Sequence, residues 1–233
     1  MKFSHRRFDL FAAGAATLLL LAAPGLRAAD VPNDMRLVFS DDFEHGADHW
    51  EPTDPAAWKI VTSDGGHVYS QYQESKFKPP YRSPFNFALV KDVTVGSFVF
   101  DARALSTKPD YNHRDMCVIF GYQDPAHFYY VHLGKKTDDH ANQIFIVNEA
   151  PRVKISTKTS PGTDWDDAWH EVRVVRKIDD ASIAIYFDDM QTPVMEATDK
   201  TFTSGRVGIG TFDDIGNWDD VKLYAAPRAT ETK

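Results

Sequence analysis

The chain has 233 residues, of which 42% are hydrophobic, 26 are Lys or Arg and 34 are Asp or Glu, for a formal net charge of −8. This apolar fraction excludes wholesale disorder, and the length fits one domain or two small ones. The acidic balance argues against a nucleic-acid binder, which needs a basic face to neutralise phosphates. Cys117 is the single cysteine, which excludes an internal disulfide and any cysteine-rich metal cluster.

The beginning of the chain has the layout of a secretory signal peptide. Arg6 and Arg7 belong to a basic start, residues 11–26 form a short apolar run, and a small residue follows at Ala28. We expect residues 1–28 to be removed on export to the periplasm or the cell exterior, with no membrane span afterwards; the alternative is an uncleaved anchor. The arginine pair is also typical of the twin-arginine route. Removal takes away four basic residues and one acidic residue, so the mature chain carries −11.

Short runs rich in Val, Ile, Phe and Tyr recur along the mature chain, separated by Gly, Pro, Asn and Asp. This alternation of runs and turn residues is typical of strands, and no window shows helical periodicity. The predicted strands are 36–43, 58–61, 67–72, 85–90, 97–105, 116–122, 128–133, 143–147, 152–156, 171–178, 182–187, 194–197, 206–212 and 218–224. The pattern predicts an all-β, two-sheet antiparallel jelly-roll sandwich. We expect a single domain over 33–226 and a flexible tail over 227–233.

Three segments have the order and spacing of the first strand, the penultimate hairpin and the closing strands of a known fold. They are 39–66, which holds Asp41-Asp42-Phe43 and Trp58-Lys59-Ile60-Val61; 169–189, which holds Trp169-His170-Glu171-Val172; and 205–221, which holds Gly205-Arg206-Val207-Gly208-Ile209-Gly210 and Asn217-Trp218-Asp219-Asp220. In these segments the chain resembles the concanavalin A-like lectin/glucanase superfamily. The nearer likeness is to its laminin-G-like bacterial branch, which includes the 3-keto-disaccharide hydrolase-like domains.

The resemblance implies two curved sheets with a concave face that binds a glycan in many relatives. It fixes no reaction, because the matching residues are structural. The family-16 glucanase branch carries a Glu-x-Asp-x-x-Glu catalytic strand, which is absent here. The two-carboxylate retaining mechanism of that branch is therefore not supported.

The resemblance also implies a calcium site. In related jelly rolls an Asp near the final strand meets the first strand and helps to bind a structural Ca²⁺. Asp219 stands at the matching position and Asp42 lies on the opening strand. Carboxylates together with turn carbonyls would supply the oxygens that Ca²⁺ prefers. The alternative is a solvated acidic turn or an edge-strand charge. No organic cofactor is expected.

The middle of the chain holds a dense set of reactive side chains. Strand alternation over 128–133 places the odd-numbered residues, which are mostly apolar, on the core face. The even-numbered residues then project the Tyr130 phenol and the His132 imidazole side by side. If that face is the concave one, these two groups act as acid and base, with His113 and Asp115 as further catalytic candidates. The alternative is an aromatic face whose polar tips hydrogen-bond to a loop.

A glycan site also needs groups that hold hydroxyls or carboxylates and rings that stack on the C–H faces of sugars. The substrate-binding candidates are Arg82, Arg114, Gln123, Tyr122 and Trp165. The polar segment 69–82 either roofs one end of the groove or is a solvated connection. Cys117 lies in an apolar strand, so we expect a buried structural thiol.

The sequence favours an exported carbohydrate-active enzyme that cleaves a glycosidic bond of an oligo- or polysaccharide on the concave sheet. Tyr, His and Arg on neighbouring strands resemble the layout of uronate lyases, although the strand motifs of those enzymes are not matched. A hydrolase would use Asp115, Asp124 or Glu149 with His132. A transition-metal site is a third option, since the middle of the chain is dense in histidine, but the spacing matches no standard pattern. The other hypotheses are a non-catalytic glycan-binding domain and a structural or adhesive envelope protein.

Overall fold

Two antiparallel sheets make up the fold in the computed structural model, which describes residues 31–226. No α-helix occurs within these residues; the regular elements are strands and one short 3-10 helix, η2 (Pro55–Ala57). The predicted all-β, two-sheet antiparallel class is therefore confirmed. The predictions of a signal peptide over 1–28 and of a tail over 227–233 fall outside the described residues. Within 31–226 no helix is long and apolar enough to cross a membrane.

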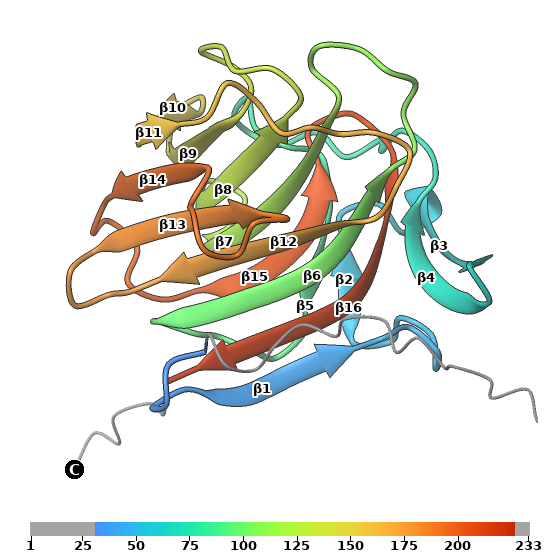
Figure 1. The fold of residues 1–233 in the computed structure, drawn as a ribbon, viewed down its shortest axis with the longest axis horizontal. Helices are drawn as coiled ribbons and strands as arrows, with labels where there is room; N and C mark the ends of the chain where they lie inside the picture. The colour runs from blue at the N-terminus through green and yellow to red at the C-terminus, as the bar shows by residue number, and fades with distance from the viewer. Residues whose placement is uncertain (1–30, 227–233) are drawn as a thin grey trace, which may run out of the picture. The chain divides into compact units, whose positions relative to one another are not determined.

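The larger sheet has nine strands and faces the viewer in Figure 1. Its strand order is β11 (Ser156–Thr159), β14 (Met195–Thr198), β13 (Ser182–Phe187), β12 (His170–Arg176), β6 (Phe98–Ser106), β16 (Gly216–Ala225), β4 (Gly66–Gln71) and β3 (Trp58–Ser63), with β1 (Arg36–Asp41) paired to β16. The pairing of β1 with β16 joins the beginning of the described chain to its end.

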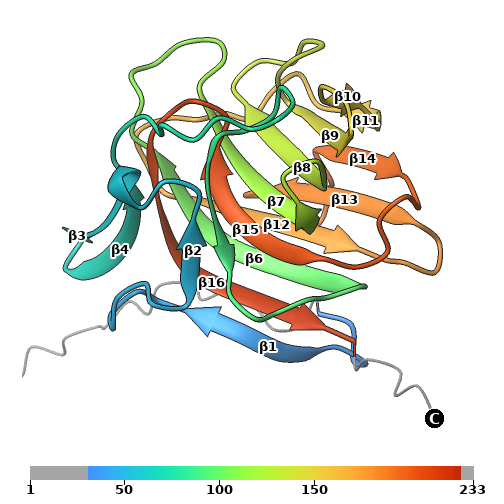
Figure 2. The same cartoon turned by 180° about the vertical axis from the view of Figure 1, so that it is seen from behind.

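The smaller sheet has seven strands and comes to the front in Figure 2. Its strand order is β10 (Val153–Lys154), β9 (Gln143–Asn148), β8 (His127–Gly134), β7 (Asp115–Asp124), β15 (Arg206–Thr211), β5 (Asn86–Val90) and β2 (Trp50–Pro52). The strand prediction missed β2 and β11. Both are short and pair with strands far away in the sequence, so no local run of β-formers marks them.

The core lies between the sheets, and β8 shows how it is built. Tyr129, Val131 and Leu133 are fully buried and pack with the inner faces of both sheets. Phe128 and Tyr130 belong to a second apolar cluster on the opposite face of the same strand. The predicted division of the strand into a core face and a second face is thus confirmed. Full burial of a large apolar side chain contributes about 1.5–3 kcal/mol, so the core face fixes the register of β8.

The outer face of the seven-stranded sheet is covered by the segment between β4 and β5, residues 72–85. Phe77, Tyr81 and Phe85 pack on the outer apolar cluster. The segment is tied down by backbone hydrogen bonds at two places, because the amide of Phe85 donates to Phe212 (3.3 Å) and that of Arg152 donates to Arg82 (3.0 Å). The polar segment is therefore a roof over this face, one of the two alternatives given by the sequence.

Glycine in β15 brings three strands close together beneath the roof. A Cβ atom on Gly210 would lie 2.3 Å from the carbonyl oxygen of Asn86 in β5, so only glycine fits. On its other side Gly210 pairs with Cys117 of β7. The loop that follows β15 consequently starts beside the beginning of β7, where the polar residues of the candidate site gather.

Candidate functional site

Strand register brings three polar side chains together at the start of β7. His132 on β8 lies directly opposite Cys117 on β7, and both point to the outer face of the sheet. Asp115 is two residues before Cys117 and so shares its face. The buried cluster Asp115–Cys117–His132 follows from this register, and its ligand atoms lie within 4.8 Å of one another.

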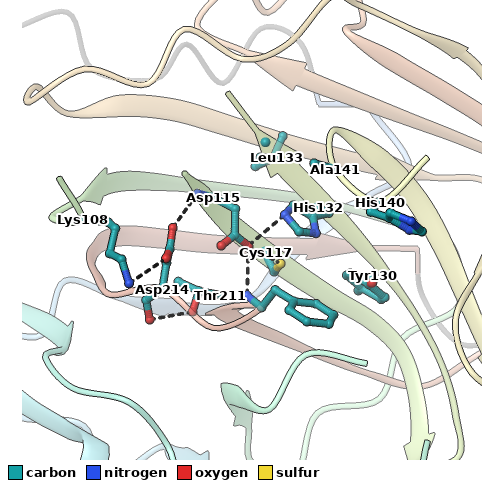
Figure 3. Close-up of polar contacts among 12 residues, drawn as sticks. Lys108, Asp115, Cys117, Tyr130, His132, Leu133, His140, Ala141, Thr211 and Asp214 are labelled. Atoms are coloured by element: carbon teal, nitrogen blue, oxygen red, sulfur yellow. Dashed lines mark hydrogen bonds and ion pairs between the residues drawn. The ribbon is translucent and has the colours of Figure 1, made fainter. Parts of the chain in front are cut away.

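The carboxylate of Asp115 is at the centre of the cluster, between Asp214 and His132 (Figure 3). Its Oδ2 accepts hydrogen bonds from the Phe212 amide at 2.9 Å and from the Cys117 thiol at 3.3 Å. The Nε2 of His132 lies 3.3 Å from the same oxygen, without the geometry of a hydrogen bond. Neither that nitrogen nor Oδ1 of Asp115 has a hydrogen-bond partner within residues 31–226.

Burial largely determines the protonation states of Asp115, Cys117 and His132. The pKa of His132 is lowered to about 3, first by burial and then by the charge of Arg152, so the imidazole is neutral. The pKa of Asp115 is raised well above its usual value by burial and by the Asp214 carboxylate. Burial and the neighbouring Asp115 likewise raise the pKa of the Cys117 thiol. All three groups therefore favour their uncharged forms, as expected where water is excluded.

Arg152 closes the outer face over Tyr130 and His132. Its Nη1 donates a hydrogen bond to the Tyr130 hydroxyl at 2.7 Å and lies 3.4 Å from Nδ1 of His132. Tyr130 is 0% exposed and His132 5% exposed. The expectation of an open groove at these two side chains is wrong, because the roof segment and Arg152 cover them. The arrangement matches the alternative of an aromatic face whose polar tips bond to a loop.

An open pocket of about 460 Å³ lies beside the buried cluster. Its lining residues are Glu74, Phe85, Lys108, Pro109, Asp110, Tyr111, Asp213 and Asp214. They come from the roof segment, the β6–β7 loop and the β15–β16 loop.

Asp214 connects the pocket to the cluster. It is buried, and its Oδ1 accepts a hydrogen bond from the Tyr111 hydroxyl at 2.8 Å and lies 3.2 Å from Nζ of Lys108. Its Oδ2 accepts a hydrogen bond from the backbone amide of Asp115 at 3.1 Å. A ligand that contacts Asp214 is thus separated from Asp115 by one side chain.

Two groups at the edge of the pocket bind their protons more tightly than usual. Partial burial, together with the adjacent Asp214 carboxylate, raises the pKa of Asp213. Burial and the hydrogen bond to Asp214 also raise the pKa of the Tyr111 phenol. The Tyr111 hydroxyl therefore keeps the proton that it donates to Asp214, and the face of its ring is the part left for a ligand.

Comparison with solved structures identifies the fold. It is a concanavalin A-like β-sandwich. The carbohydrate-binding module CBM66 from Bacillus subtilis superposes with a TM-score of 0.54 at 13% identity, over 76% of this chain and 96% of that one. Domain 4 of AbnA, a GH43 extracellular arabinanase from Geobacillus stearothermophilus in complex with arabinotriose, gives 0.52 at 10% identity, over 82% and 93%.

A Bacillus subtilis protein with a galectin-like fold gives a TM-score of 0.52 at 12% identity, over 83% of this chain and 97% of that one. At such identities the likeness extends to the fold alone. No family model matches the chain. No curated protein matches it either.

The structure separates the other predicted catalytic and binding residues from the cluster. His113 is half exposed and pairs with Asp138 at 2.8 Å. Arg114 is buried, where it donates hydrogen bonds to Ser106 and Asp167. His113 and Arg114 both lie in the β6–β7 loop, and their side chains are held by Asp138 and Asp167 respectively. Neither side chain lines the pocket.

Trp165 is 1% exposed, and its indole N–H donates to the carbonyl oxygen of Leu133 at 2.7 Å. Its predicted role as a stacking platform is wrong, because the ring is part of the core. Tyr122 packs against the outer apolar cluster, and exposed Gln123 makes a 3.5 Å contact with the Ser204 carbonyl. The Arg82 guanidinium lies on the roof, 5.8 Å from the ring centre of Phe212.

The predicted calcium residues lie at the junction of β1 and β16. Asp42 follows the last pair of this ladder and lines a separate pocket of about 310 Å³. Asp219 has its Oδ2 3.6 Å from Nη1 of Arg103. Burial raises the pKa of Asp219 to about 6. Within residues 31–226, neither aspartate belongs to a group of three or more clustered metal-ligating side chains.

The sequence prediction missed several residues of the site. They are Glu74, Lys108, Arg152, Asp213 and Asp214. The pair Asp213-Asp214 directly after the predicted strand 206–212 was a usable signal, because acidic side chains at strand ends commonly line binding loops. Glu74 and Arg152 carry no such signal, since the roof brings them to the site from distant segments.

Proposed function

We propose that this protein binds a neutral oligosaccharide in the pocket lined by Tyr111 and Asp213. The observation that carries the proposal is an open pocket of about 460 Å³ in which a half-exposed tyrosine ring stands beside several carboxylates. Its size falls within the roughly 300–1,000 Å³ of small-molecule sites. A ring for sugar C–H faces and oxygens for hydroxyls are the groups that such a ligand needs.

The charge of the pocket supports a neutral ligand. The lining contains the acids Glu74, Asp110, Asp213 and Asp214 against a single lysine, Lys108. Lys108 lies 3.2 Å from Asp214 and so is not free to neutralise a sugar carboxylate. A uronate would meet like charge here, which counts against a uronate lyase.

The solved structures of similar fold support a carbohydrate ligand in general terms. One similar structure is described as a carbohydrate-binding module and another is in complex with arabinotriose. We further propose that export directed by residues 1–28 takes the protein to a compartment where polysaccharides are available.

Glycoside hydrolysis is the second candidate function, and the raised pKa of Asp213 favours it. Burial and the Asp214 carboxylate both raise this pKa. A carboxylic acid whose pKa is raised by burial and by a neighbouring carboxylate has one of the properties of a general acid. Binding remains the first proposal because Asp214 is fully engaged by Tyr111, Lys108 and the Asp115 amide.

Calorimetric titration with arabino-, xylo- and gluco-oligosaccharides and with oligogalacturonate tests the proposal. We expect one neutral series to bind, and Tyr111→Ala or Asp213→Asn to weaken its binding at least about tenfold, since the loss of a hydrogen bond to a charged group costs about 1.5–3 kcal/mol and about 1.4 kcal/mol is tenfold in affinity. Tyr72→Ala is the matched control, because Tyr72 is 38% and Tyr111 39% exposed and Tyr72 lies outside the pocket.

Reducing-end release in the same mixtures separates the two candidates. Binding without products supports a binding protein, whereas products that disappear in Asp213→Asn support the hydrolase. If no neutral glycan binds, or if Tyr72→Ala weakens binding as much as Tyr111→Ala, this pocket is not the glycan site.

A further inference from the structure

We propose that Asp115, Cys117 and His132 bind a transition-metal ion of the zinc type beneath the pocket. The three side chains offer one oxygen, one sulfur and one nitrogen within 4.8 Å of one another. A thiolate with an imidazole selects borderline and soft metals over calcium or magnesium. This proposal is independent of the glycan site, because none of the three side chains lines the open pocket.

The spacing of the ligand atoms fits a tetrahedral ion. The Oδ2 of Asp115 lies 3.3 Å from Nε2 of His132 and 3.3 Å from Sγ of Cys117. Tetrahedral zinc with its usual bond lengths holds such atoms about 3.3–3.6 Å apart. The ion would therefore need little movement of the two paired strands, and its fourth position would be left to a small ligand such as water.

Two buried atoms at this place lack the hydrogen bonds that a closed polar network would give them. They are Nε2 of His132, which points at the Asp115 carboxylate in Figure 3, and Oδ1 of Asp115. Neither has a partner within residues 31–226, although His132 is 5% and Asp115 0% exposed. Leaving a buried polar group unpaired costs about 1–3 kcal/mol, and a metal bond to Nε2 would remove that cost for His132.

The surroundings of the cluster suit a metal held away from bulk water. The Phe212 ring stacks on the His132 ring with centroids 5.7 Å apart, and the Phe145 ring is tilted beside it, with centroids 6.5 Å apart. Asp213 and Asp214 offer carboxylate oxygens within 4.8 Å of Asp115 and also line the open pocket. They provide an acidic route for a cation from solvent to the cluster.

Metal binding would change two contacts of the apo cluster. The Cys117 thiol proton and the Asp115 carboxyl proton would both leave to solvent, because the thiolate and the carboxylate are the ligands. A metal on Nε2 places the imidazole proton on Nδ1, so the 3.4 Å approach of Arg152 to Nδ1 would be given up. Arg152 can keep its shorter, 2.7 Å hydrogen bond to the Tyr130 hydroxyl.

Titration of the purified, chelator-treated and reduced protein with Co²⁺ tests the proposal. We expect one equivalent to give a thiolate-to-cobalt charge-transfer band, and Zn²⁺ to displace it and raise the melting temperature. Cys117→Ser should abolish the band, and His132→Gln should weaken Co²⁺ binding at least about 100-fold, the upper range for loss of a supporting residue. His127→Gln, at the other end of β8, is the control that keeps the wild-type spectrum.

The wild-type titration decides the matter even if a variant does not fold. No charge-transfer band at near-stoichiometric Co²⁺ overturns the proposal. It is also overturned if Cys117→Ser keeps the binding of Co²⁺ while Asp213→Asn removes it, since the cation would then belong to the carboxylates of the pocket.

Discussion

Arg152 is a single side chain that supports several buried groups at once. Its guanidinium lies over the rings of Phe212 and Phe145, 4.2 and 4.7 Å from their centres, while it bonds to the Tyr130 hydroxyl. A cation over an aromatic ring contributes about 0.5–2 kcal/mol and a hydrogen bond to a buried group about 1 kcal/mol. Burial raises the pKa of Tyr130, so its hydroxyl keeps its proton and accepts from Arg152.

Arg152→Ala should therefore lower the free energy of unfolding by about 2 kcal/mol, because it removes the stacking and leaves a buried hydroxyl unpaired. Urea denaturation followed by tryptophan fluorescence measures the loss. Lys154→Ala is the control, since Lys154 makes an exposed ion pair with Asp139, worth at most about 1 kcal/mol. Equal losses in the two variants would contradict the role of Arg152.

His170, at the start of β12, binds the turn that follows β13. Its Nδ1 lies 2.8 Å from Asp188 and its Nε2 3.2 Å from Asp166. Burial acts to lower the pKa of His170, but the hydrogen bond and charge of Asp188 and then the charge of Asp166 outweigh it, so the pKa is raised. The folded protein binds this proton more tightly than the unfolded chain does.

A raised pKa fixes the direction of the pH dependence. The contribution of His170 to stability is complete below its unfolded pKa of about 6.5 and is lost as the pH rises through the higher folded value. The melting temperature of the wild type should exceed that of His170→Gln by more at about pH 6 than at about pH 9. A pH-independent gap for His170→Gln would contradict the argument.

The junction of β1 and β16 is the place of the calcium prediction, which stays a prediction. Ca²⁺ at about 100 times its dissociation constant should raise the free energy of unfolding by about 2.7 kcal/mol. For a domain of this length the melting temperature should rise by about 5–10 °C. Asp42→Asn should remove the rise, and Asp139→Asn, on the exposed β8–β9 loop, should keep it. If both variants respond like the wild type, the ion does not bind at Asp42.

Local patterns predicted the elements better than the contacts between them. Alternation along β8 assigned Tyr129 and Tyr130 to opposite faces correctly, because the two-residue period is a property of the strand itself. The same pattern could not show that Arg152 and the segment 72–85 cover this outer face, since those residues come from distant parts of the chain. Trp165 lies beside a loop in sequence, yet its burial depends on where that loop packs.

At the scale of the whole molecule, the net charge and the location of the pocket together affect which ligands can approach the site. The full chain carries a formal charge of −8, and the lining of the pocket is itself acidic. The pocket lies where the roof segment, the β6–β7 loop and the β15–β16 loop meet, at one end of the seven-stranded sheet. A polyanion that approaches this end meets repulsion from the whole molecule as well as from the pocket.

The salt dependence of binding therefore distinguishes a site that recognises sugar hydroxyl groups from one that recognises charge. Binding of the neutral oligosaccharide should change less than about twofold between about 10 mM and about 500 mM salt, because screening acts on charged partners. Oligogalacturonate should not bind at the lower salt concentration. Affinity electrophoresis in gels containing each polysaccharide measures both, with Asp213→Asn and Glu74→Gln combined to reduce the acidity of the pocket. Tight binding of oligogalacturonate to the wild type at low salt would contradict the neutral-ligand proposal, since it would need a basic surface that outweighs the pocket carboxylates.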